Sequence, residues 1–502
     1  MTDRRPTNPP ADGLLRGEPR EVGVNAALVD AFLDDAATAG LDIHGLMLHR
    51  AGRVVAEGWR WPYRADRPRI MHSATKSVMA CAIGMALEEG RFGLQDKVVA
   101  FFPELTPGVI DAKLASMTVE NLLTMRAGHA AETSGSIWRG ISTSWTAEFF
   151  KIPVVHQPGT TYVYTSAASY MLSAILTRVT GQTLHDYLKP RLFEPLGIVD
   201  EQWDLGPDNV NPGGNGLTMK TADLLKLGVL HAQGGVWNGR RVLSERWIAE
   251  ATRSHGDDYG YQWTTASGGA YLAIGIFMQF VMVFPRHQAA LVMIGAAQEG
   301  SKLFLPIVQR YFPRALEEKL PADLAPKADA RLRARLAAAA EQPAITASLA
   351  AFHGATSSNT AESSGVGAPS KTAAQVNGRT FRIEPNSLGV TAVRFVFEKD
   401  RCVFYLVDAA GDHRIECGLR EWIESRTDMP GADLHHGYVF DAAIVVASAF
   451  WADENTLRMT WVFAETAFRD TVICRFDAEG VTLERSVNVN SSAHAWPRLS
   501  GK

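Results

Sequence analysis

The stretch Met71-His-Ser-Ala-Thr-Lys-Ser77 opens a long apolar run that ends at Gly90. From Ser73 to Glu89 the chain is rich in Ala, Met and Leu, which predicts a mostly buried helix with Gly90 as its C-terminal stop. Ser73 and Lys76 are three residues apart, so both side chains project from one face of that helix. A buried lysine needs a partner or a function, because charged side chains are rarely buried otherwise.

The Ser73–Lys76 pair has the chemistry of an activated nucleophile. A serine hydroxyl is weakly nucleophilic at neutral pH and needs a neighbouring base to take its proton. Burial favours a low pKa for the Lys76 amine, and the helix N-terminus places a positive dipole end near a developing oxyanion. Chance gives about one such pair in an ordinary chain of this length. Ser73, however, is the only serine in this sequence with a lysine three residues later.

A second polar stretch, Gln157-Pro-Gly-Thr-Thr-Tyr-Val-Tyr-Thr-Ser166, carries a candidate acid/base in Tyr164. A tyrosine beside a lysine ammonium can shuttle a proton between nucleophile and leaving group. An isolated tyrosine is more often a packing residue. His72 adjoins the nucleophile but points about 100° away on a helix, which favours packing or capping. His435 and His436 lack metal-ligand partners at suitable spacing, so we expect them at the surface.

The segments around the helix alternate between strand-like and helical patterns. Residues 42–60 predict a β-hairpin with its turn at Ala51-Gly52, and about 115–255 is largely helical. Strands are then expected at 259–264, 270–284 and 289–296, the last two joined at Pro285-Arg-His287. Strands from both ends of the segment with helices between them predict an α/β (α+β) fold.

A length of 502 residues favours two domains. We expect an N-terminal extension at 1–24, a catalytic domain at 25–315, and a helical segment with a flexible linker at 316–375. The linker prediction rests on a Ser-, Thr-, Gly- and Ala-rich composition at 354–375. Residues 376–502 alternate like strands in many places and predict a β-rich, antiparallel C-terminal domain.

Composition and charge indicate which kinds of partner the protein is expected to lack. The chain is 46% hydrophobic and 21% charged with a net charge of −4 and no long basic run, so we expect no nucleic-acid partner. No apolar stretch reaches spanning length and no export signal is visible, so we expect a cytoplasmic protein without a membrane partner. The four cysteines show no paired spacing and are expected as buried free thiols. No metal site or cofactor is predicted.

The order of these pieces resembles the β-lactamase-related serine hydrolases, which include class C β-lactamases, D,D-peptidases, family VIII esterases and nylon-oligomer hydrolases. The resemblance covers about residues 25–312. Besides 71–77 and 158–166, the matching stretches are Glu88–Asp96, Leu122–Gly128 and Leu192–Ile198. It implies a β-lactamase/transpeptidase-like sheet flanked by helices.

In that family the Ser-x-x-Lys motif and the tyrosine of a Tyr-x-Asn motif are catalytic, and these roles fall on Ser73, Lys76 and Tyr164. Ser166 stands where relatives have the asparagine of the second motif. Its shorter side chain still donates and accepts a hydrogen bond, so it is expected to position substrate or Lys76.

The third family motif, Lys-Thr-Gly or His-x-Gly in relatives, aligns with Ile276-Phe-Met278 on the expected strand at 270–284. Ile276, expected to contact substrate, replaces the cation that captures a substrate carboxylate in penicillin-binding relatives. The backbone amide that follows the motif, that of Gln279, is expected to complete the oxyanion hole with the amide of Ser73.

These features predict a hydrolase that cleaves a small-molecule ester or small amide through an acyl-enzyme on Ser73. β-Lactamase or D-amino-acid peptidase activity is the alternative within the family. A non-catalytic binding or sensor protein that retained the fold is the alternative outside it. The C-terminal domain loosely resembles the lipocalin-like barrels appended to some D-amino-acid peptidases. Three roles remain open for it: capping the active site, binding substrate, or making a homo-oligomer contact.

Overall fold

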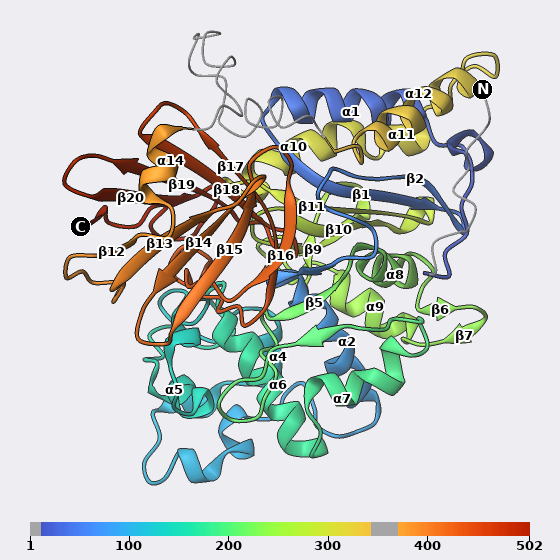
Figure 1. The fold of residues 1–502 in the computed structure, drawn as a ribbon. Coiled ribbons are helices and arrows are strands. Elements are labelled where there is room, and N and C mark those ends of the chain that lie inside the picture. Colours follow the sequence, from blue (N-terminus) through green and yellow to red (C-terminus); the bar gives the residue numbers. More distant parts are fainter. Residues whose placement is uncertain (1–11, 343–369) are drawn as a thin grey trace. The chain divides into compact units, whose positions relative to one another are not determined.

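The computed structural model describes residues 12–342 and 370–502, which form two compact units (Figure 1). The first unit contains the described residues up to 59 together with 65–339, and the second contains 60–64 and the described residues from 340 onward. Most of the expected linker at 354–375 and nearly half of the expected N-terminal extension lie outside the described residues.

A six-stranded sheet forms the centre of the first unit. The predicted hairpin at 42–60 is confirmed as β1 (Asp42–Arg50) and β2 (Arg53–Trp59). β1 also pairs with β11 (Ala289–Ala296), which comes from the far end of the unit. The sheet order is β2, β1, β11, β10 (Gln279–Phe284), β9 (Tyr271–Gly275) and β8 (Thr264–Thr265), and all the pairs are antiparallel.

Both faces of this sheet are buried. Along β11, Leu291 and Met293 contribute to one apolar cluster, and Ala290 and Val292 contribute to another. Because side chains alternate along a strand, a central strand buried on both faces must be apolar throughout. One cluster includes the helices at the two ends of the unit, and the other includes the helix that follows Ser73 (Figure 1). The terminal helices are α1 (Ala26–Thr38), α10 (Ser301–Tyr311), α11 (Arg314–Glu317) and α12 (Ala325–Ala338). On the other face lie α2 (Thr75–Glu88) and α8 (Thr221–Ala232).

The expected helical block between the sheet's two halves is confirmed. It contains α3 (Ala112–Ser116), α4 (Val119–Leu123), α5 (Trp145–Lys151), α6 (Ser166–Thr180), α7 (Leu184–Leu188) and α9 (Glu245–Thr252). A small sheet of β3 (Pro68–Ile70), β5 (Leu217–Lys220) and β4 (Gln202–Trp203) joins this block to the start of α2. A short hairpin, β6 (Val236–Trp237) and β7 (Arg240–Arg241), follows α8.

Two strand predictions are wrong. Residues 270–284 form two antiparallel strands, β9 and β10, because the chain reverses at Ile276, Phe277 and Met278. Phe277 and Met278 adopt left-handed backbone angles, with φ of 60° and 71°. The expected strand at 259–264 is reduced to an isolated bridge between Tyr259 and Thr264, and β8 covers only 264–265. Apolar runs of this kind do not reveal where a strand ends.

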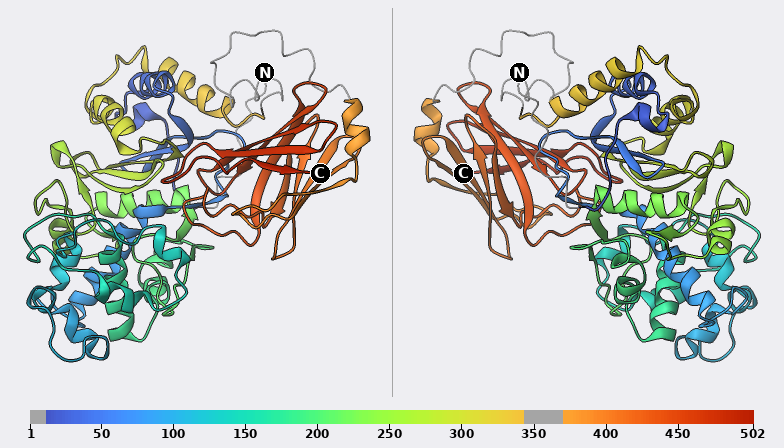
Figure 2. Two further views of the ribbon diagram at one scale, coloured as in Figure 1. Left: turned by 90° about the vertical axis from the view of Figure 1, so that its left-hand side faces the viewer. Right: turned by 90° about the vertical axis from the view of Figure 1, so that its right-hand side faces the viewer.

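The second unit confirms the predicted β-rich domain. Its strands follow the order β12 (Thr380–Arg382), β13 (Ala392–Phe397), β14 (Arg401–Val407), β15 (Asp412–Gly418), β17 (Ala443–Trp451), β18 (Thr456–Phe463), β19 (Arg469–Phe476), β20 (Val481–Val487) and β21 (Leu499–Gly501). β16 (Ile423–Thr427) pairs with β17, and helix α14 (Lys371–Val376) precedes β12. Figure 2 shows these strands, coloured orange to red, from two sides.

Hydrogen bonds between the ends of this sheet curl it into a barrel. The Arg382 and Lys502 backbones exchange two hydrogen bonds of 2.9 and 3.0 Å. The sheet is mixed, because β15 and β17 make a single parallel bridge between Gly418 and Ser448. Closure removes the unpaired strand edges that would otherwise be exposed.

The expected exposure of His435 is wrong. His435, expected at the surface, is fully buried, and its Nε2 lies 2.9 Å from Asp470 Oδ1. Arg485 donates to the other oxygen of Asp470 at 2.7 Å, so the histidine belongs to a buried polar network. The four cysteines are confirmed as buried free thiols, although Cys402 and Cys417 face one another across β14 and β15. Within the described ranges, no helix has both the length and the apolar character needed to cross a membrane.

Helix α8 approaches the sheet closely at Gly228, and this contact is testable. A Cβ added there would lie 2.5 Å from Val281 Cγ2 and 3.0 Å from Ala290 Cβ. We expect Gly228→Val to lower the free energy of unfolding by about 1–3 kcal/mol through overpacking. Thermal and denaturant unfolding measure the change. Gly140→Val is the control, because nothing lies within 4 Å of the added atom there. Equal stability of the two variants would contradict the tight contact.

Candidate active site

The nucleophile candidate lies where the small sheet passes into the first long helix. β3 ends at Ile70, the backbone N–H of Met71 donates to Leu217 O at 2.9 Å, and a 3₁₀ turn (η2, His72–Ala74) leads into α2. Ser73 lies in this turn and is partly exposed, whereas His72 is buried and meets the Phe277 ring edge-on at 5.5 Å. The expected packing role of His72 is therefore confirmed, and Ser73 faces the solvent-accessible side.

Lys76 is 2% exposed and donates three hydrogen bonds. Its Nζ lies 3.1 Å from Ser73 Oγ, 3.0 Å from Ser166 Oγ and 2.9 Å from Gly214 O. Burial lowers the pKa of this amine to about 8, and the negative charge of Glu132 opposes part of that shift. The amine can therefore lose its proton near neutral pH, and once neutral it can accept a hydrogen bond from the Ser73 hydroxyl 3.1 Å away.

Tyr164 completes the group around the amine. Its ring centroid lies 4.8 Å from Lys76 Nζ. Part of the ring is exposed, but burial around the hydroxyl raises the pKa of Tyr164 well above its usual value. The phenol therefore stays protonated where Lys76 titrates, which suits it to donate a proton.

Ser166 and Glu132 connect this group to helix α6. Ser166 is the first residue of α6, and its backbone N–H donates to both carboxylate oxygens of Glu132, at 2.8 and 3.1 Å. The backbone N–H and the hydroxyl of Ser134 donate to the same carboxylate. A carboxylate at a helix N-terminus is favoured by the helix dipole. Sequence reasoning missed Glu132, because a single acidic residue in a loop has no distinguishing spacing.

The predicted third motif lies in the β9–β10 turn and not on a strand. β9 and β10 both contact the nucleophile turn η2. At the end of β9, a Cβ added to Gly275 would lie only 2.2 Å from Met71 O, so only glycine allows this approach. Ile276 is half-buried and Gln279 pairs with Gly275 at the start of β10. Ile276 as a substrate contact and the Gln279 amide as an oxyanion donor stay predictions.

An aromatic hollow adjoins the amine. It is lined by Ser134, Gly135, Trp138, Trp145, Ser166, Tyr170, Pro212, Gly214 and Asn215, two of which bind Lys76. The ring centroids of Trp138, Trp145 and Tyr170 lie 5.6–6.1 Å apart. The Tyr170 hydroxyl donates to Asp208, and the Trp145 indole N–H donates to Ile141 O. Of the described residues that line this hollow, none is charged.

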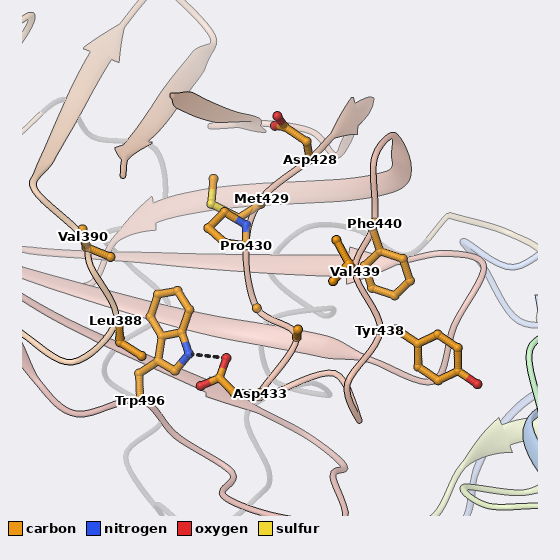
Figure 3. Close-up of a pocket in the computed structure, with 12 residues that line it drawn as sticks. Leu388, Val390, Asp428, Met429, Pro430, Asp433, Tyr438, Val439, Phe440 and Trp496 are labelled. Carbon is orange, nitrogen blue, oxygen red and sulfur yellow. Dashed lines mark hydrogen bonds between the residues drawn. The ribbon is translucent and has the colours of Figure 1, made fainter. Parts of the chain in front are cut away.

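The second unit contains a separate hollow, shown in Figure 3. Its walls include Leu388, Met429, Val439, Phe440 and Trp496, whose indole N–H donates to Asp433 Oδ1 at 3.0 Å. The described lining residues include no serine, cysteine, lysine or histidine. Among residues 12–342 and 370–502, no cluster of three metal-ligating side chains occurs. The contacts around Ser73 therefore make the first unit the place of the candidate active site.

The fold is that of a β-lactamase-type domain. The family model described as Beta-lactamase matches residues 26–304, more than half of the chain. This protein belongs to the β-lactamase family.

Individual relatives are distant. The chain is 26% identical over 203 residues to a lovastatin esterase of Penicillium rubens, spanning 36% of this chain and 51% of that protein. It is 24% identical over 278 residues to a 6-aminohexanoate-dimer hydrolase of Paenarthrobacter ureafaciens, spanning 49% of this chain and 71% of that protein. A solved putative 6-aminohexanoate-dimer hydrolase from Bacillus anthracis superposes with a TM-score of 0.51 at 15% identity, covering 60% of this chain and 87% of that one. This last likeness is one of fold.

The charge of Glu132 gives a prediction for the pH dependence. An amine accepts a proton only when it is neutral, so if Lys76 takes the Ser73 proton, activity should rise with pH through the Lys76 pKa of about 8. Glu132 raises that pKa, so Glu132→Gln should move the acidic limb of the kcat/KM profile to lower pH, while the amide oxygen can still accept from Ser166. The control is Glu104→Gln, which removes a surface ion pair with Arg178. An unmoved limb, or one moved to higher pH, would count against this electrostatic coupling.

Proposed function

We propose that this protein is a serine hydrolase that cleaves neutral small-molecule esters or amides through an acyl-enzyme on Ser73. The observation that carries the proposal is the 3.1 Å hydrogen bond between Ser73 Oγ and an amine whose pKa is lowered to about 8. Nucleophilic catalysis by serine requires that its hydroxyl contact a base whose pKa lies near the working pH.

The proposed reaction has two halves. Neutral Lys76 takes the Ser73 proton as Oγ attacks the carbonyl carbon, and the backbone amides of Ser73 and Gln279 bind the oxyanion. When the tetrahedral intermediate collapses, the bond to the leaving group breaks and Tyr164 gives that group its proton. Lys76 then returns a proton to Tyr164. Water attacks the acyl-enzyme by the same path in reverse and releases the acid and Ser73.

Neutral substrates are favoured by the groups that surround the nucleophile. Ile276 stands where relatives have a cation, and losing a charge-assisted hydrogen bond costs about 1.5–3 kcal/mol, or about 10- to 150-fold in affinity for a carboxylate. The names of the lovastatin esterase and the 6-aminohexanoate-dimer hydrolase support hydrolysis in this branch of the family.

The nucleophile is tested by Ser73→Ala. We expect it to abolish labelling by a fluorophosphonate probe and to lower kcat/KM for p-nitrophenyl butyrate by about 10³-fold or more. Ser267→Ala, a change in the short turn before β9, should label and turn over as the wild type does. Wild-type protein that neither labels nor hydrolyses any ester or amide in a substrate library would instead favour a binding or sensor protein.

The substrate preference is tested by comparing a neutral ester with a β-lactam that bears a carboxylate. Because Ile276 cannot pair with a carboxylate, kcat/KM for p-nitrophenyl butyrate should exceed that for a cephalosporin under the same conditions. Steady-state kinetics on both compounds give the ratio. Faster hydrolysis of the cephalosporin would reverse the assignment in favour of β-lactamase or D-amino-acid peptidase activity.

A further inference from the structure

A buried arginine lies between the nucleophile and the β9–β10 turn. Arg69 is 1% exposed and stands on β3, four residues before Ser73. Its Nε donates to Gln279 Oε1 at 2.9 Å, and one terminal nitrogen donates to Gly295 O at 2.7 Å and meets His44 Nδ1 at 3.0 Å. The guanidinium therefore connects β3 with β10, β11 and β1 at one end of the sheet.

Gln279 transmits this connection to the turn. Its side chain is fully buried, and its Nε2 donates to Phe277 O at 2.8 Å, Gly295 O at 2.9 Å and Ile276 O at 3.3 Å. The carboxamide thus accepts from Arg69 through its oxygen and holds the turn's carbonyls through its nitrogen. We call this chain of contacts from Arg69 through Gln279 to the turn the Arg69–Gln279 bridge.

The turn needs such support because of its backbone. Phe277 and Met278 are consecutive left-handed residues, and neither is glycine, asparagine or aspartate. Residues held in such regions cost about 1–3 kcal/mol each and persist only when the surrounding structure determines them. The hydrogen bonds from Gln279 to the carbonyls of Ile276 and Phe277 fix the peptide planes on which the directions of the neighbouring N–H groups depend.

We propose that Arg69 is a positioning residue that sets the oxyanion hole through the Arg69–Gln279 bridge. This rests on the proposed role of Ser73. Two amides bind one oxyanion only if both N–H groups lie about 2.7–3.1 Å from it. One amide belongs to Ser73, just beyond the strand that bears Arg69, and the other is the backbone N–H of Gln279 itself, which directly follows the turn that its side chain holds. The close approach of Gly275 to Met71 fixes the same two segments at a second point.

An arginine suits this role better than a lysine. The planar guanidinium directs several N–H groups at fixed angles, so it can bind Gln279 and Gly295 together. A lysine offers one nitrogen on a flexible stem and cannot reproduce that fork. We therefore expect Arg69→Lys to recover little of the activity that Arg69→Met loses.

The test compares catalysis with folding. Arg69→Met keeps an apolar stem but no donor, and we expect its single-turnover acylation by p-nitrophenyl butyrate to slow by about 10²-fold, with KM within about threefold of wild type. Difference infrared spectroscopy of the acyl-enzyme should show its ester carbonyl stretch at higher frequency, since that band reports hydrogen bonding in the oxyanion hole. Arg335→Met is the control, because Arg335, on α12, donates to Asp30 and Asp34 on α1. It should lower stability and leave both readouts unchanged.

A second variant allows the proposal to be tested even if the Arg69→Met protein does not fold. Gln279→Met breaks the bridge at its centre but leaves Arg69 its bond to Gly295, and it should shift kcat and the carbonyl band in the same direction. The Arg69→Met/Gln279→Met double variant should lose little more than either single variant, because both remove one pathway. If Arg69→Met does not fold, the readouts from Gln279→Met decide the proposal.

The possible outcomes separate the two proposals. Wild-type activity that disappears in Ser73→Ala, with acylation and carbonyl band unchanged in the folded bridge variants, would overturn the role of Arg69 and leave the hydrolase assignment in place. Activity that does not depend on Ser73 would overturn the hydrolase assignment itself. Additive losses in the double variant would also contradict the bridge, since they would show that the two residues act separately.

Discussion

The burial of the Lys76 ammonium is the constraint on which the candidate site depends. A charged amine at 2% exposure is tolerated only if its donors are satisfied, and here they are taken by Ser73, Ser166 and Gly214. Those three acceptors come from the start of α2, the start of α6 and the loop before β5. One buried charge therefore specifies how three segments that are distant in sequence meet. The same burial lowers the amine's pKa to about 8 and so makes it usable as a base.

Two parts of the fold position the site: the loop that carries Glu132, and the turn between β9 and β10. Glu132 accepts hydrogen bonds from the first residue of α6, and its negative charge partly offsets the lowering of the Lys76 pKa by burial. On the opposite side, the central sheet brings the β9–β10 turn against η2, where Gly275 permits close backbone contact. The barrel of the second unit has its own buried network of His435, Asp470 and Arg485.

Much of this arrangement could be predicted from local patterns. Alternation revealed the hairpin at 42–60 and most barrel strands, and an Ala- and Met-rich run ending in Gly90 revealed α2. The turn at 276–278 could not be predicted, because its residues are apolar and its left-handed backbone is bonded by the Gln279 side chain, which in turn accepts from the distant Arg69. His435 was misassigned to the surface for the same kind of reason, since its partner Asp470 lies 35 residues away. Local sequence reports propensity, whereas buried polar networks depend on tertiary contacts.

The most direct test of the central claim is the pKa of Lys76 itself. Lysines labelled with ¹³C at Cε can be titrated by NMR, and the Lys76 resonance can be assigned by its absence in Lys76→Met. A midpoint near pH 8, the value to which burial lowers the pKa of this amine, would support Lys76 as the base for Ser73. A midpoint near the ordinary value of 10.5 would show an amine that stays protonated at neutral pH, and it would contradict the account of how Ser73 is activated.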